Sequence, residues 1–364
     1  MKTAKLIPIV IAAGGTGGHI FPALSVALQF KKDRGDVGLL WIGTARSRET
    51  ELCAKHTIPI KLFNVTGIER NFSLKTIKAL LQCFVSFLWS SSLFIKNRPV
   101  AVLAFGGYVC APVLAAARLL SIPYFIHEQN TAVGLVNRVF ASHSRKFFAG
   151  LPMTAGKKIS GYEMTGTPVR EREQSYERFA YPSGFDAAKM TILICGGSQG
   201  AQSMNECLKE PATRWAAKGF QIVWQTGAAG YHDILAHVQS LKNIFVFPTF
   251  DDLYPFYSVA CLVIGRAGAS TLAEIAYFGL PCVLIPLPWA ADNHQWTNAG
   301  VVEEQGWGIR VKQDDLCQTH VDASVMMIVT DKQRCETMKA QSLSYAPTDA
   351  AQTIVRKVMD AIAV

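Results

Sequence analysis

One histidine directly follows a run of glycines near the start of the chain. The segment AAGGTGGHIFPA, residues 12–23, places His19 where an apolar strand should end and a helix should begin. Because the positive end of a helix disfavours imidazolium, we expect a neutral ring at pH 7. A neutral imidazole can accept a proton from a substrate hydroxyl. The position therefore predicts a general base, with a purely structural histidine as the alternative.

The glycines of this segment are more typical of an anion-binding turn than of a dinucleotide site. A GxGxxG fingerprint would place its third glycine at Ile20, and the next strand closes on Thr44 rather than on an acidic residue. The P-loop pattern fails as well, because no Gly-Lys-Ser/Thr follows. A glycine turn before a helix still exposes backbone N–H groups at the positive end of the helix dipole. We expect an anion there, with a ligand-free tight turn as the alternative.

The pentapeptide GGSQG, residues 196–200, is compatible with two functions. It matches the GxSxG nucleophile elbow with Ser198 as the serine, which opens a serine hydrolase hypothesis. Such an enzyme needs a late histidine at the end of a strand, and only His294 follows a convincing strand candidate. The same residues could instead place a hydroxyl and backbone amides around a phosphate. The parallel with the first glycine turn favours phosphate binding.

A third turn of small residues, GRAGASTLAE at 265–274, indicates a nucleotide site. A strand should end at Gly265 and a helix should start near Ser270, which lets a diphosphate approach the helix N-terminus. Glu274 lies one turn into that helix, where a carboxylate can accept hydrogen bonds from the two hydroxyls of a ribose. Thr271 and Glu274 also have capping-box spacing, which is the structural alternative. The segment ADNHQWTNA, residues 291–299, adds polar side chains at the same sheet edge.

The elements that position these turns are short apolar runs alternating with longer amphipathic stretches. The runs are apolar on both faces, as expected of parallel strands covered by helices. Each half of the chain opens with a strand leading into a glycine turn, so the pattern predicts two Rossmann-like domains. The join is expected within residues 166–184, and the last helix could belong to either domain. The strand candidates are 6–12, 37–43, 100–106, 123–128, 190–196, 220–227, 244–250, 261–267 and 281–287.

Positive charge is concentrated in the first half of the chain. The 364 residues carry a net charge of +9, but residues 1–168 hold 20 Lys and Arg against 7 Asp and Glu, giving +13. This bias indicates an anionic partner for the first half, with colloidal solubility as the alternative. Nucleic acid, an anionic membrane and a phosphorylated substrate all fit the charge. The nine cysteines show no metal-ligand spacing, which is typical of reduced thiols in a cytosolic protein.

Residues 73–99 contain an unusually apolar helix candidate. The 17 residues from Ala79 to Ile95 carry no charge, slightly fewer than the roughly 20 apolar residues that span a bilayer. Several aromatic side chains lie within the segment, and lysine or arginine flanks both ends. This composition fits a helix lying in a membrane interface. A buried crossover helix is the alternative, and both can hold on different faces.

Seven motifs in order carry a family resemblance that extends over essentially the whole chain. They are AAGGTGGHIFPA, GGYVCAP, HEQN…GLVNR, TGTPVR, ICGGSQGA, GRAGASTLAE and NHQWTNA. Together they resemble the bacterial N-acetylglucosaminyltransferases of peptidoglycan synthesis in glycosyltransferase family 28. The resemblance implies an α/β GT-B fold, with two Rossmann-like doubly wound parallel-sheet domains facing a cleft. It implies that residues 1–168 and 347–364 form the acceptor and membrane-docking domain and that 169–346 bind the donor.

The resemblance also implies a reaction and a cellular location. GlcNAc would pass with inversion from UDP-GlcNAc to the C4 hydroxyl of MurNAc in lipid I, which is undecaprenyl-diphospho-MurNAc-pentapeptide, to give lipid II. The enzyme would be peripheral on the cytoplasmic face of the cell membrane, docked on anionic lipid through 73–99. No metal, other cofactor or nucleic acid is expected, and cell-wall synthesis proteins are candidate partners. A serine hydrolase using Ser198 and a non-catalytic nucleotide-sugar-binding subunit remain the alternatives.

The motifs carry the family's site residues to positions in this chain. His19 is the candidate base, with Glu128 as its rival or orienting partner. Glu274 is expected on the ribose, the backbone of Phe250 on uracil and Gln295 on the donor sugar. Thr167 stands where the family usually has asparagine. The donor-binding residues implied are Thr16, Gly17, Gly18, Asn130, Arg170, Ser198, Phe250, Ala269, Ser270, Thr271, Leu272, Ala273, Glu274 and Gln295. The acceptor-binding residues implied are His19, Tyr108, Glu128 and Asn137.

Overall fold

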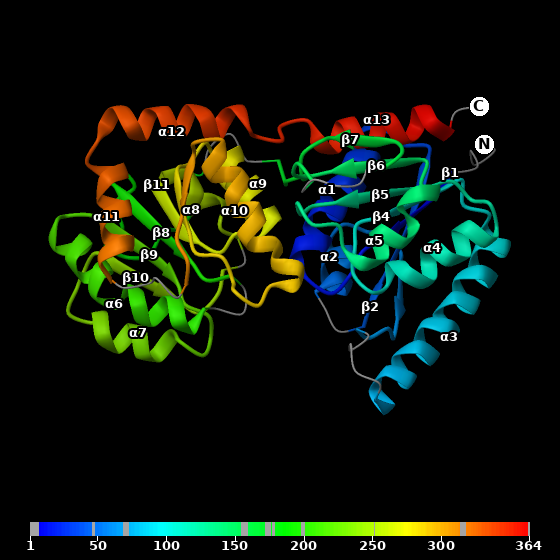
Figure 1. Ribbon diagram of the computed structural model, residues 1–364, viewed down its shortest axis with the longest axis horizontal. Helices are drawn as coiled ribbons and strands as arrows, with labels where there is room; N and C mark the ends of the chain where they lie inside the picture. The colour runs from blue at the N-terminus through cyan, green and yellow to red at the C-terminus, as the bar shows by residue number, and fades with distance from the viewer. Residues whose placement is uncertain are drawn as a thin grey trace. The chain divides into compact units, whose positions relative to one another are not determined.

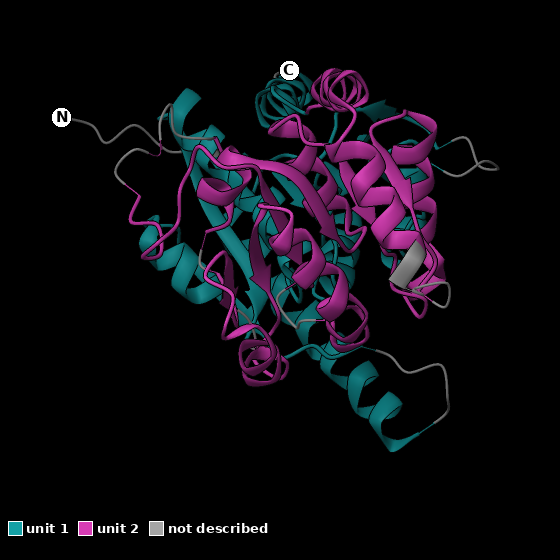
Figure 2. Ribbon diagram, turned by 90° about the vertical axis from the view of Figure 1, so that its left-hand side faces the viewer, with its two compact units in different colours: residues 1–170, 347–364 teal, residues 171–346 magenta. Residues whose placement is uncertain are grey.

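The computed structural model divides the chain into two compact units. Unit 1 comprises residues 1–170 and 347–364, and unit 2 comprises residues 171–346 (Figure 2). The structure describes residues 7–45, 48–67, 73–153, 159–171, 176, 179–197, 201–250, 252–313 and 318–362. Ser198 therefore lies outside the described residues.

Unit 1 is built on a seven-stranded parallel sheet in the order β3-β2-β1-β4-β5-β6-β7 (Figure 1). Its strands are β1 (Ile7–Ala12), β2 (Val37–Thr44), β3 (Ile60–Phe63), β4 (Ala101–Ala104), β5 (Tyr124–Glu128), β6 (Lys146–Ala149) and β7 (Tyr162–Met164). Its helices are α1 (Gly17–Asp33), α2 (Glu49–Lys55), α3 (Leu74–Asn97), α4 (Cys110–Leu119), α5 (Leu135–Phe140) and α13 (Ala350–Ile362), with a 3-10 turn at Ala141–His143.

Both faces of this sheet are apolar and covered by helices. On β1, Ile9 and Ile11 face one side, where α1 and α13 pack, while Val10 and Ala12 face the side of α3 and α4. The two helices of the first layer lie side by side, α13 in red next to α1 in blue (Figure 1). This alternation of two apolar faces is the reason the strand reads as a continuous apolar run.

Unit 2 repeats the plan with a six-stranded parallel sheet in the order β10-β9-β8-β11-β12-β13. Its strands are β8 (Thr191–Cys195), β9 (Gln221–Gln225), β10 (Ile244–Phe247), β11 (Ala260–Gly265), β12 (Cys282–Leu284) and β13 (Gly308–Arg310). Its helices are α6 (Gln202–Ala217), α7 (Tyr231–Val238), α8 (Tyr254–Val259), α9 (Ala269–Tyr277), α10 (His294–Glu304), α11 (Gln318–Val329) and α12 (Lys332–Ser344), with a 3-10 turn at Ala291–Asn293. The two doubly wound parallel sheets confirm the predicted fold class.

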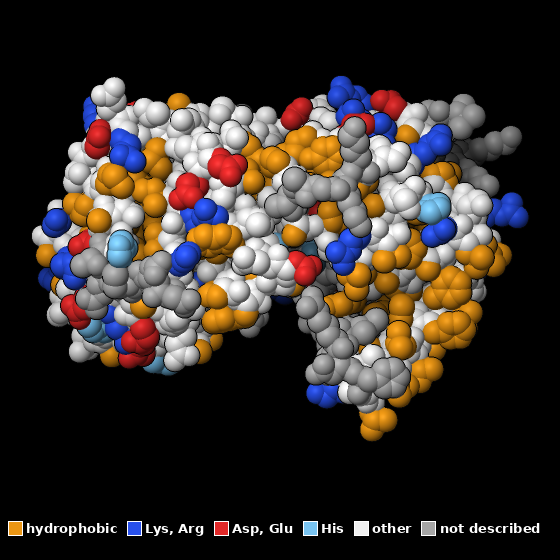
Figure 3. All heavy atoms as spheres, in the orientation of Figure 1, with side chains coloured by type: hydrophobic (Ala, Val, Ile, Leu, Met, Phe, Trp, Pro, Cys, Tyr) orange, Lys and Arg blue, Asp and Glu red, His pale blue; other side chains and the backbone are white. Residues whose placement is uncertain are grey.

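The helix α3 has an inverted distribution of side chains. Its buried stripe is mostly small or polar, whereas its large apolar side chains point to solvent, which reverses the usual pattern of a surface helix. Figure 3 shows the resulting apolar surface over α3 at the lower right. Among the described residues, α3 is long and apolar enough to cross a bilayer by length and composition alone. The buried residues are Thr76, Ala79, Ser86, Ser90 and Phe94. The exposed ones are Leu74, Ile77, Leu80, Leu81, Phe84, Val85, Leu88, Trp89 and Ile95.

Candidate active site

The strand order of each sheet reverses at one point, and ligands of open α/β sheets bind at such points, beyond the carboxyl ends of the strands. In unit 1 the reversal lies between β1 and β4, and in unit 2 between β8 and β11. Three of the four loops that follow these strands are the glycine-rich segments noted in the sequence, and the fourth is the GGYV loop. The topology therefore brings the loops that carry His19 and Tyr108 to the switch point of unit 1, and the loop that leads to Glu274 to that of unit 2.

In unit 1 the two switch-point loops touch through backbone atoms. Gly107 has φ +86°, and a Cβ there would collide with the carbonyl oxygen of Gly14. Only glycine combines that conformation with that approach. The amide of Phe105 also donates to the oxygen of Ala12 at 2.9 Å. The loop after β1 is consequently held against the loop after β4.

His19 is half-buried in the first turn of α1. Its Nδ1 lies 3.3 Å from the carbonyl oxygen of Gly14 and 3.4 Å from the hydroxyl of Thr16. Because a carbonyl oxygen only accepts, this contact requires the proton on Nδ1, which places the ring's lone pair on Nε2. The Nε2 edge faces Gly106, where a Cβ would lie 2.9 Å away. The ring is thus oriented with its basic nitrogen beside a position that lacks a side chain.

The predicted donor residues Thr16, Gly17 and Gly18 lie at this same helix start. Thr16 is the N-cap and makes no side-chain cap bond, while the amides of His19 and Ile20 bond to its carbonyl oxygen. Thr16 and Gly17 are exposed and Gly18 is half-buried. The first turn of α1 therefore presents backbone and hydroxyl groups to solvent, as an anion or sugar site requires.

Glu128 is a buried carboxylate at the end of β5 whose oxygens are both occupied. Oε1 accepts from the backbone and side-chain nitrogens of Asn130 at 3.1 and 3.2 Å. Oε2 accepts from Gly134 N and Asn137 Nδ2, each at 2.9 Å. These four contacts hold the carboxylate in one orientation and occupy both of its oxygens. The geometry favours the orienting role for Glu128 and leaves His19 as the stronger candidate base.

Two predicted acceptor residues lie near these loops. Asn137 is buried, and its Oδ1 has no hydrogen-bond partner among the described residues. A buried acceptor of this kind is uncommon and is a natural partner for a substrate hydroxyl or a water. Tyr108 follows the glycine pair after β4 and is 54% exposed, with Gly67 in contact with its ring. Its phenol is available to a ligand at the surface of unit 1.

The TGTPVR segment runs beside α1 and carries Arg170. The guanidinium carbon of Arg170 lies 6.0 Å from the ring centroid of Phe21, two residues after His19. Thr167 is buried against Gly150, and its hydroxyl has no hydrogen-bond partner among the described residues. The segment is instead tied to β5 by His127, whose Nε2 lies 3.1 Å from the oxygen of Gly166.

His127 is a buried residue that the sequence did not single out. Burial lowers its pKa to about 4, and Gln129 Nε2 donates to its Nδ1 at 3.2 Å. The unfolded chain therefore takes up this proton first as the pH falls below about 6.5. Stability is complete above that value and is lost toward pH 4.

We expect unit 1 to lose about 2 kcal/mol of unfolding free energy between pH 7 and pH 5 through His127 alone. Hydrogen exchange of unit 1 amides at the two pH values measures the loss. His127→Gln removes the titrating ring and should flatten this component. An unchanged pH slope in the variant would contradict the assignment.

In unit 2 the switch-point strands also meet closely. A Cβ on Gly265, at the end of β11, would lie 2.9 Å from the carbonyl oxygen of Cys195, at the end of β8. The helix α9 begins at Ala269 with Gly268 as its N-cap and no side-chain cap bond. Thr271 and Glu274 both lie inside the helix, so the capping-box alternative is wrong. The N-cap is Gly268, three residues before Thr271, so Thr271 cannot be the cap.

The start of α9 offers amides rather than side chains to a ligand. Ala269 and Leu272 are buried, whereas Ser270, Thr271 and Ala273 are half-buried. The amide of Leu272 is bonded to the oxygen of Gly268 at 2.9 Å, so the first-turn amides are those of residues 269–271. These groups and the helix dipole suit a diphosphate.

Glu274 is half-buried and lies close to the end of β8. Burial is the main cause that raises the pKa of the Cys195 thiol, and the negative charge of Glu274 raises it further. The same two causes hold the pKa of the Tyr257 phenol well above its usual range. The structure thus brings Glu274 to the loop that continues into GGSQG, as a nucleotide site built from both segments requires.

Arg266 is a further candidate site residue. It lies in the GRAGASTLAE motif, but its sequence position alone predicted no role for it. Its guanidinium donates to the oxygen of Ile285 at 2.9 Å and to Gln313 Oε1 at 2.8 Å, and burial lowers its pKa. Asn298, also missed, donates from Nδ2 to the oxygen of Ala267 at 3.1 Å. Arg266 ties the loop after β11 to those after β12 and β13, and its described hydrogen-bond acceptors are all neutral. Its positive charge therefore remains available to an anion at this edge.

Gln295 lies in the first turn of α10. Its Oε1 accepts from Leu287 N at 3.0 Å, which turns the amide nitrogen toward other partners. The next residue, Trp296, is covered by Arg310, whose guanidinium carbon is 3.9 Å from a ring centroid and which also pairs with Glu303 at 3.0 Å. This packing along α10 fixes the turn that carries Gln295.

Phe250 follows β10 in a cluster of aromatic side chains. Its ring centroid lies 4.5 Å from that of Phe247 and 4.9 Å from that of Phe256. Aromatic packing of this kind holds a loop in one conformation. The backbone of Phe250 can consequently meet a flat base in a defined position.

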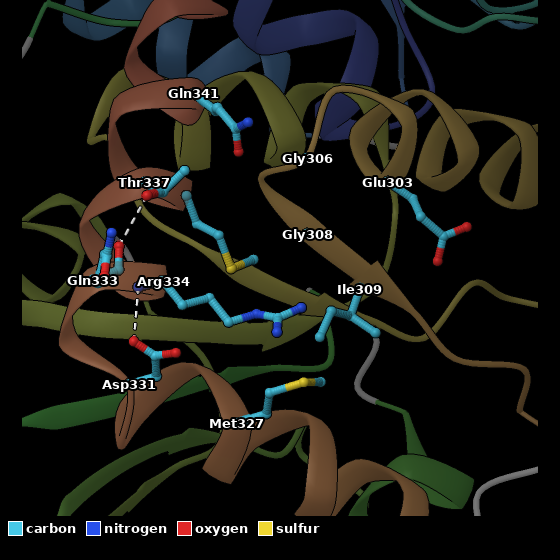
Figure 4. Close-up of a pocket in the computed structure, with 11 residues that line it drawn as sticks. Glu303, Gly306, Gly308, Ile309, Met327, Asp331, Gln333, Arg334, Thr337 and Gln341 are labelled. Carbon is cyan, nitrogen blue, oxygen red and sulfur yellow. Dashed lines mark hydrogen bonds between the residues drawn. The ribbon is translucent and has the colours of Figure 1, made fainter.

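A cavity of about 670 Å³ lies elsewhere in unit 2, at the amino end of β13 (Figure 4). Arg334 extends into it toward Ile309, with Met327 and Gln341 on its walls (Figure 4). It shares no residue with the predicted site, which follows the carboxyl ends of the strands. Within the described ranges, no group of three or more histidine, cysteine or acidic residues is arranged to hold a metal ion.

Comparison with known proteins identifies relatives over nearly the whole length of the chain. Residues 9–149 match the glycosyltransferase family 28 N-terminal domain, and residues 191–354 match the glycosyltransferase family 28 C-terminal domain. The UDP-N-acetylglucosamine--N-acetylmuramyl-(pentapeptide) pyrophosphoryl-undecaprenol N-acetylglucosamine transferase of Listeria welshimeri is 33% identical, covering 96% of this chain and 98% of that protein. The protein of that name from Desulfotalea psychrophila is 34% identical, covering 98% and 97%. The crystal structure of Acinetobacter baumannii MurG superposes with a TM-score of 0.74 at 28% identity, covering 97% and 99%.

Proposed function

Since this chain belongs to glycosyltransferase family 28, we propose that it transfers N-acetylglucosamine from UDP-GlcNAc to the C4 hydroxyl of MurNAc in lipid I. The product is lipid II, the substrate for later steps of peptidoglycan synthesis. The names of the relatives support this donor and this acceptor. They give no support to a hydrolase centred on Ser198.

The reaction is a single displacement that inverts the anomeric carbon. The C4 oxygen of the acceptor attacks that carbon while its bond to the diphosphate oxygen breaks, and UDP leaves with the bonding electron pair. The hydroxyl proton passes to Nε2 of His19, because the contact with Gly14 keeps the other ring nitrogen protonated. One base and one stabilised leaving group are sufficient for this step.

The start of α9 with Glu274 one turn inside is the observation that carries the proposal. In unit 2, Glu274 accepts from the two ribose hydroxyls while the amides of residues 269–271 and Arg266 stabilise the diphosphate. The Phe250 backbone meets uracil and Gln295 Nε2 meets the sugar. Ser198 and Arg170 are assigned to the diphosphate by their motifs.

Unit 1 binds the acceptor and carries the base. Tyr108 and Asn137 contact the acceptor, and Glu128 keeps the loop from Asn130 to Asn137 in position. Thr16, Gly17, Gly18 and Asn130 are assigned to the GlcNAc group as it is transferred.

The assay that tests this function measures UDP release from UDP-GlcNAc with and without a lipid I analogue. We expect release only with the acceptor, together with a β-1,4-linked product. Release that does not depend on the acceptor, or labelling of Ser198 by a fluorophosphonate with ester hydrolysis, would contradict the proposal. UDP-GlcNAc binding without turnover would instead indicate a non-catalytic binding subunit.

The exposed face of α3 supports a peripheral position on the cytoplasmic membrane surface, where the acceptor lipid is anchored. An exposed helix face built from so many large apolar side chains is unusual for a soluble protein. Lys75, Lys78, Lys96 and Arg98 are exposed at the two ends of the helix, where anionic headgroups would attract them. One face of α3, which is mostly small or polar, packs on unit 1, and only the opposite face is free to enter lipid. The helix therefore lies in the membrane interface rather than across the bilayer. No protein partner is assigned.

Replacing the exposed residues Phe84, Leu88 and Trp89 by serine should weaken binding to anionic vesicles about 100-fold. Each half-exposed side chain contributes about 1 kcal/mol when it enters lipid. Phe87 is left unchanged because it packs on the core of unit 1. Co-sedimentation with phosphatidylglycerol vesicles measures the loss, and turnover of a soluble acceptor should persist. Leu235→Ser, on the exposed side of α7, is the matched control. Loss of soluble turnover in the triple variant would instead identify α3 as a core helix.

A further inference from the structure

Unit 1 contains a fully buried carboxylate that the proposed reaction does not use. Glu49 is the first residue of α2, and none of its surface reaches solvent. Glutamate is almost never found fully buried without specific partners. Two glycines make room for it. A Cβ at Gly14 would lie 2.9 Å from Oε1, and one at Gly43 would collide with Oε2. Glycine at positions 14 and 43 therefore leaves room for the carboxylate on two sides.

The partners of Glu49 are donors from the loops after β1 and β2. Oε2 accepts from Thr44 N at 2.6 Å, and Oε1 accepts from Gly15 N at 3.2 Å and from the Thr44 hydroxyl at 3.4 Å. Both oxygens accept from backbone N–H groups, which only donate, and these contacts fix the orientation of the carboxylate. A buried charge held by oriented N–H groups is a fixed electrostatic element of the unit.

The peptide group between Gly14 and Gly15 joins this carboxylate to His19. Its N–H donates to Glu49 at 3.2 Å, and its carbonyl oxygen lies 3.3 Å from His19 Nδ1. Hydrogen bonds in a chain polarise one another, so a carboxylate on the N–H makes the carbonyl a stronger acceptor. One peptide group thus separates the negative charge from the imidazole.

We propose that Glu49 is a positioning residue for His19 and acts through the Gly14–Gly15 peptide. The inference rests on the proposed function, in which His19 is the base. Glu49 holds the peptide in the orientation that receives the Nδ1 proton, and so presents Nε2 to the acceptor hydroxyl. As His19 takes up the C4 proton, the polarised carbonyl and the carboxylate stabilise the imidazolium. No proton moves through the peptide.

The arrangement is related to the carboxylate that holds the catalytic histidine in serine hydrolases, where the contact with Nδ1 is direct. Here the intervening peptide weakens the effect. We therefore expect a loss of about tenfold in kcat when the charge is removed, far less than the 10⁴-fold loss of the direct case. Binding of UDP-GlcNAc by unit 2 should not change.

The ¹⁵N spectrum of the His19 ring in the full-length protein is the first test. His19→Gln assigns the resonances among the eight histidines. The inference requires the Nδ1–H tautomer in the wild type. A predominant Nε2–H tautomer would overturn it, whether or not any Glu49 variant folds, and would leave the transferase assay unaffected.

The second test compares Glu49→Gln with Glu51→Gln, an exposed carboxylate two residues further on the same helix. A glutamine at 49 keeps the shape but can accept only one of the two backbone N–H groups. We expect a mixed tautomer, a tenfold lower kcat and an unchanged KM for UDP-GlcNAc, with Glu51→Gln indistinguishable from wild type. Reduced stability with unchanged tautomer and kcat would show a purely structural carboxylate. If His19→Gln retains full activity, the base assignment fails while the tautomer result stands.

Discussion

His19→Ala should lower kcat by about 10²–10⁴-fold, the usual contribution of a general base. The KM for UDP-GlcNAc should change little, because Glu274 and Phe250, which are assigned to the ribose and the uracil, lie in unit 2 and are unchanged. Steady-state UDP release with a soluble lipid I analogue measures both constants. The physical reason is the ring orientation, which presents Nε2 beside Gly106.

His143→Ala provides the matched control, because His143 is a solvent-exposed histidine of the same unit. It should leave both constants unchanged. A loss of less than about threefold in His19→Ala would remove His19 as the base and direct attention to Glu128.

Glu274→Ala should raise the KM for UDP-GlcNAc by about 30-fold or more. Two hydrogen bonds from ribose hydroxyls to one carboxylate are lost, each contributing on the order of 1–1.5 kcal/mol. The kcat should change less, since the ribose is remote from the reacting bond. Glu274→Gln keeps one acceptor oxygen, so its KM for UDP-GlcNAc should lie between those of Glu274→Ala and the wild type.

A 2′-deoxyribose analogue of the donor sharpens this test. The wild type should bind the analogue more weakly than UDP-GlcNAc, whereas Glu274→Ala should bind the two equally. Glu304→Ala, an exposed carboxylate on α10, should behave as the wild type. If Glu274→Ala and the wild type prefer UDP-GlcNAc over the 2′-deoxy analogue by the same factor, the ribose contact is refuted.

The two parallel sheets were predictable because their central strands are apolar on both faces. Ile9 and Val10 bury against opposite helix layers, and the sequence shows this as an unbroken apolar run. The strands β3, β6, β7 and β13 were missed. They are only three or four residues long, include charged residues such as Arg310, and lie at or near sheet edges. Strands as short as β12 were found only where they lie inside a longer apolar run, such as PCVLIPL at 281–287, and these four strands lack such a run.

The candidate site was predictable only where it follows a glycine turn. His19 and Glu274 were identified by their positions at such turns. Arg266 and Glu49 were not, because their roles depend on contacts distant in sequence: Glu49 bonds Gly15 from 34 positions away, and Arg266 bonds Gln313 from 47. Spacing along the chain carries no trace of such pairs. The capping-box interpretation was wrong although Thr271 and Glu274 have the right spacing, because both residues lie inside a helix that begins at Ala269.

The position of α13 has a consequence for synthesis of the protein on the ribosome. Ile354, Val355 and Val358 complete a core of unit 1 whose other members lie before residue 150. All of unit 2, residues 171–346, must be translated before they emerge. At 5–20 residues per second, the nascent first unit waits on the order of 10–40 s with α1 uncovered and with the apolar face of α3 already made. A chaperone that binds apolar surface has that interval in which to act, and a chain truncated before Pro347 should remain its client.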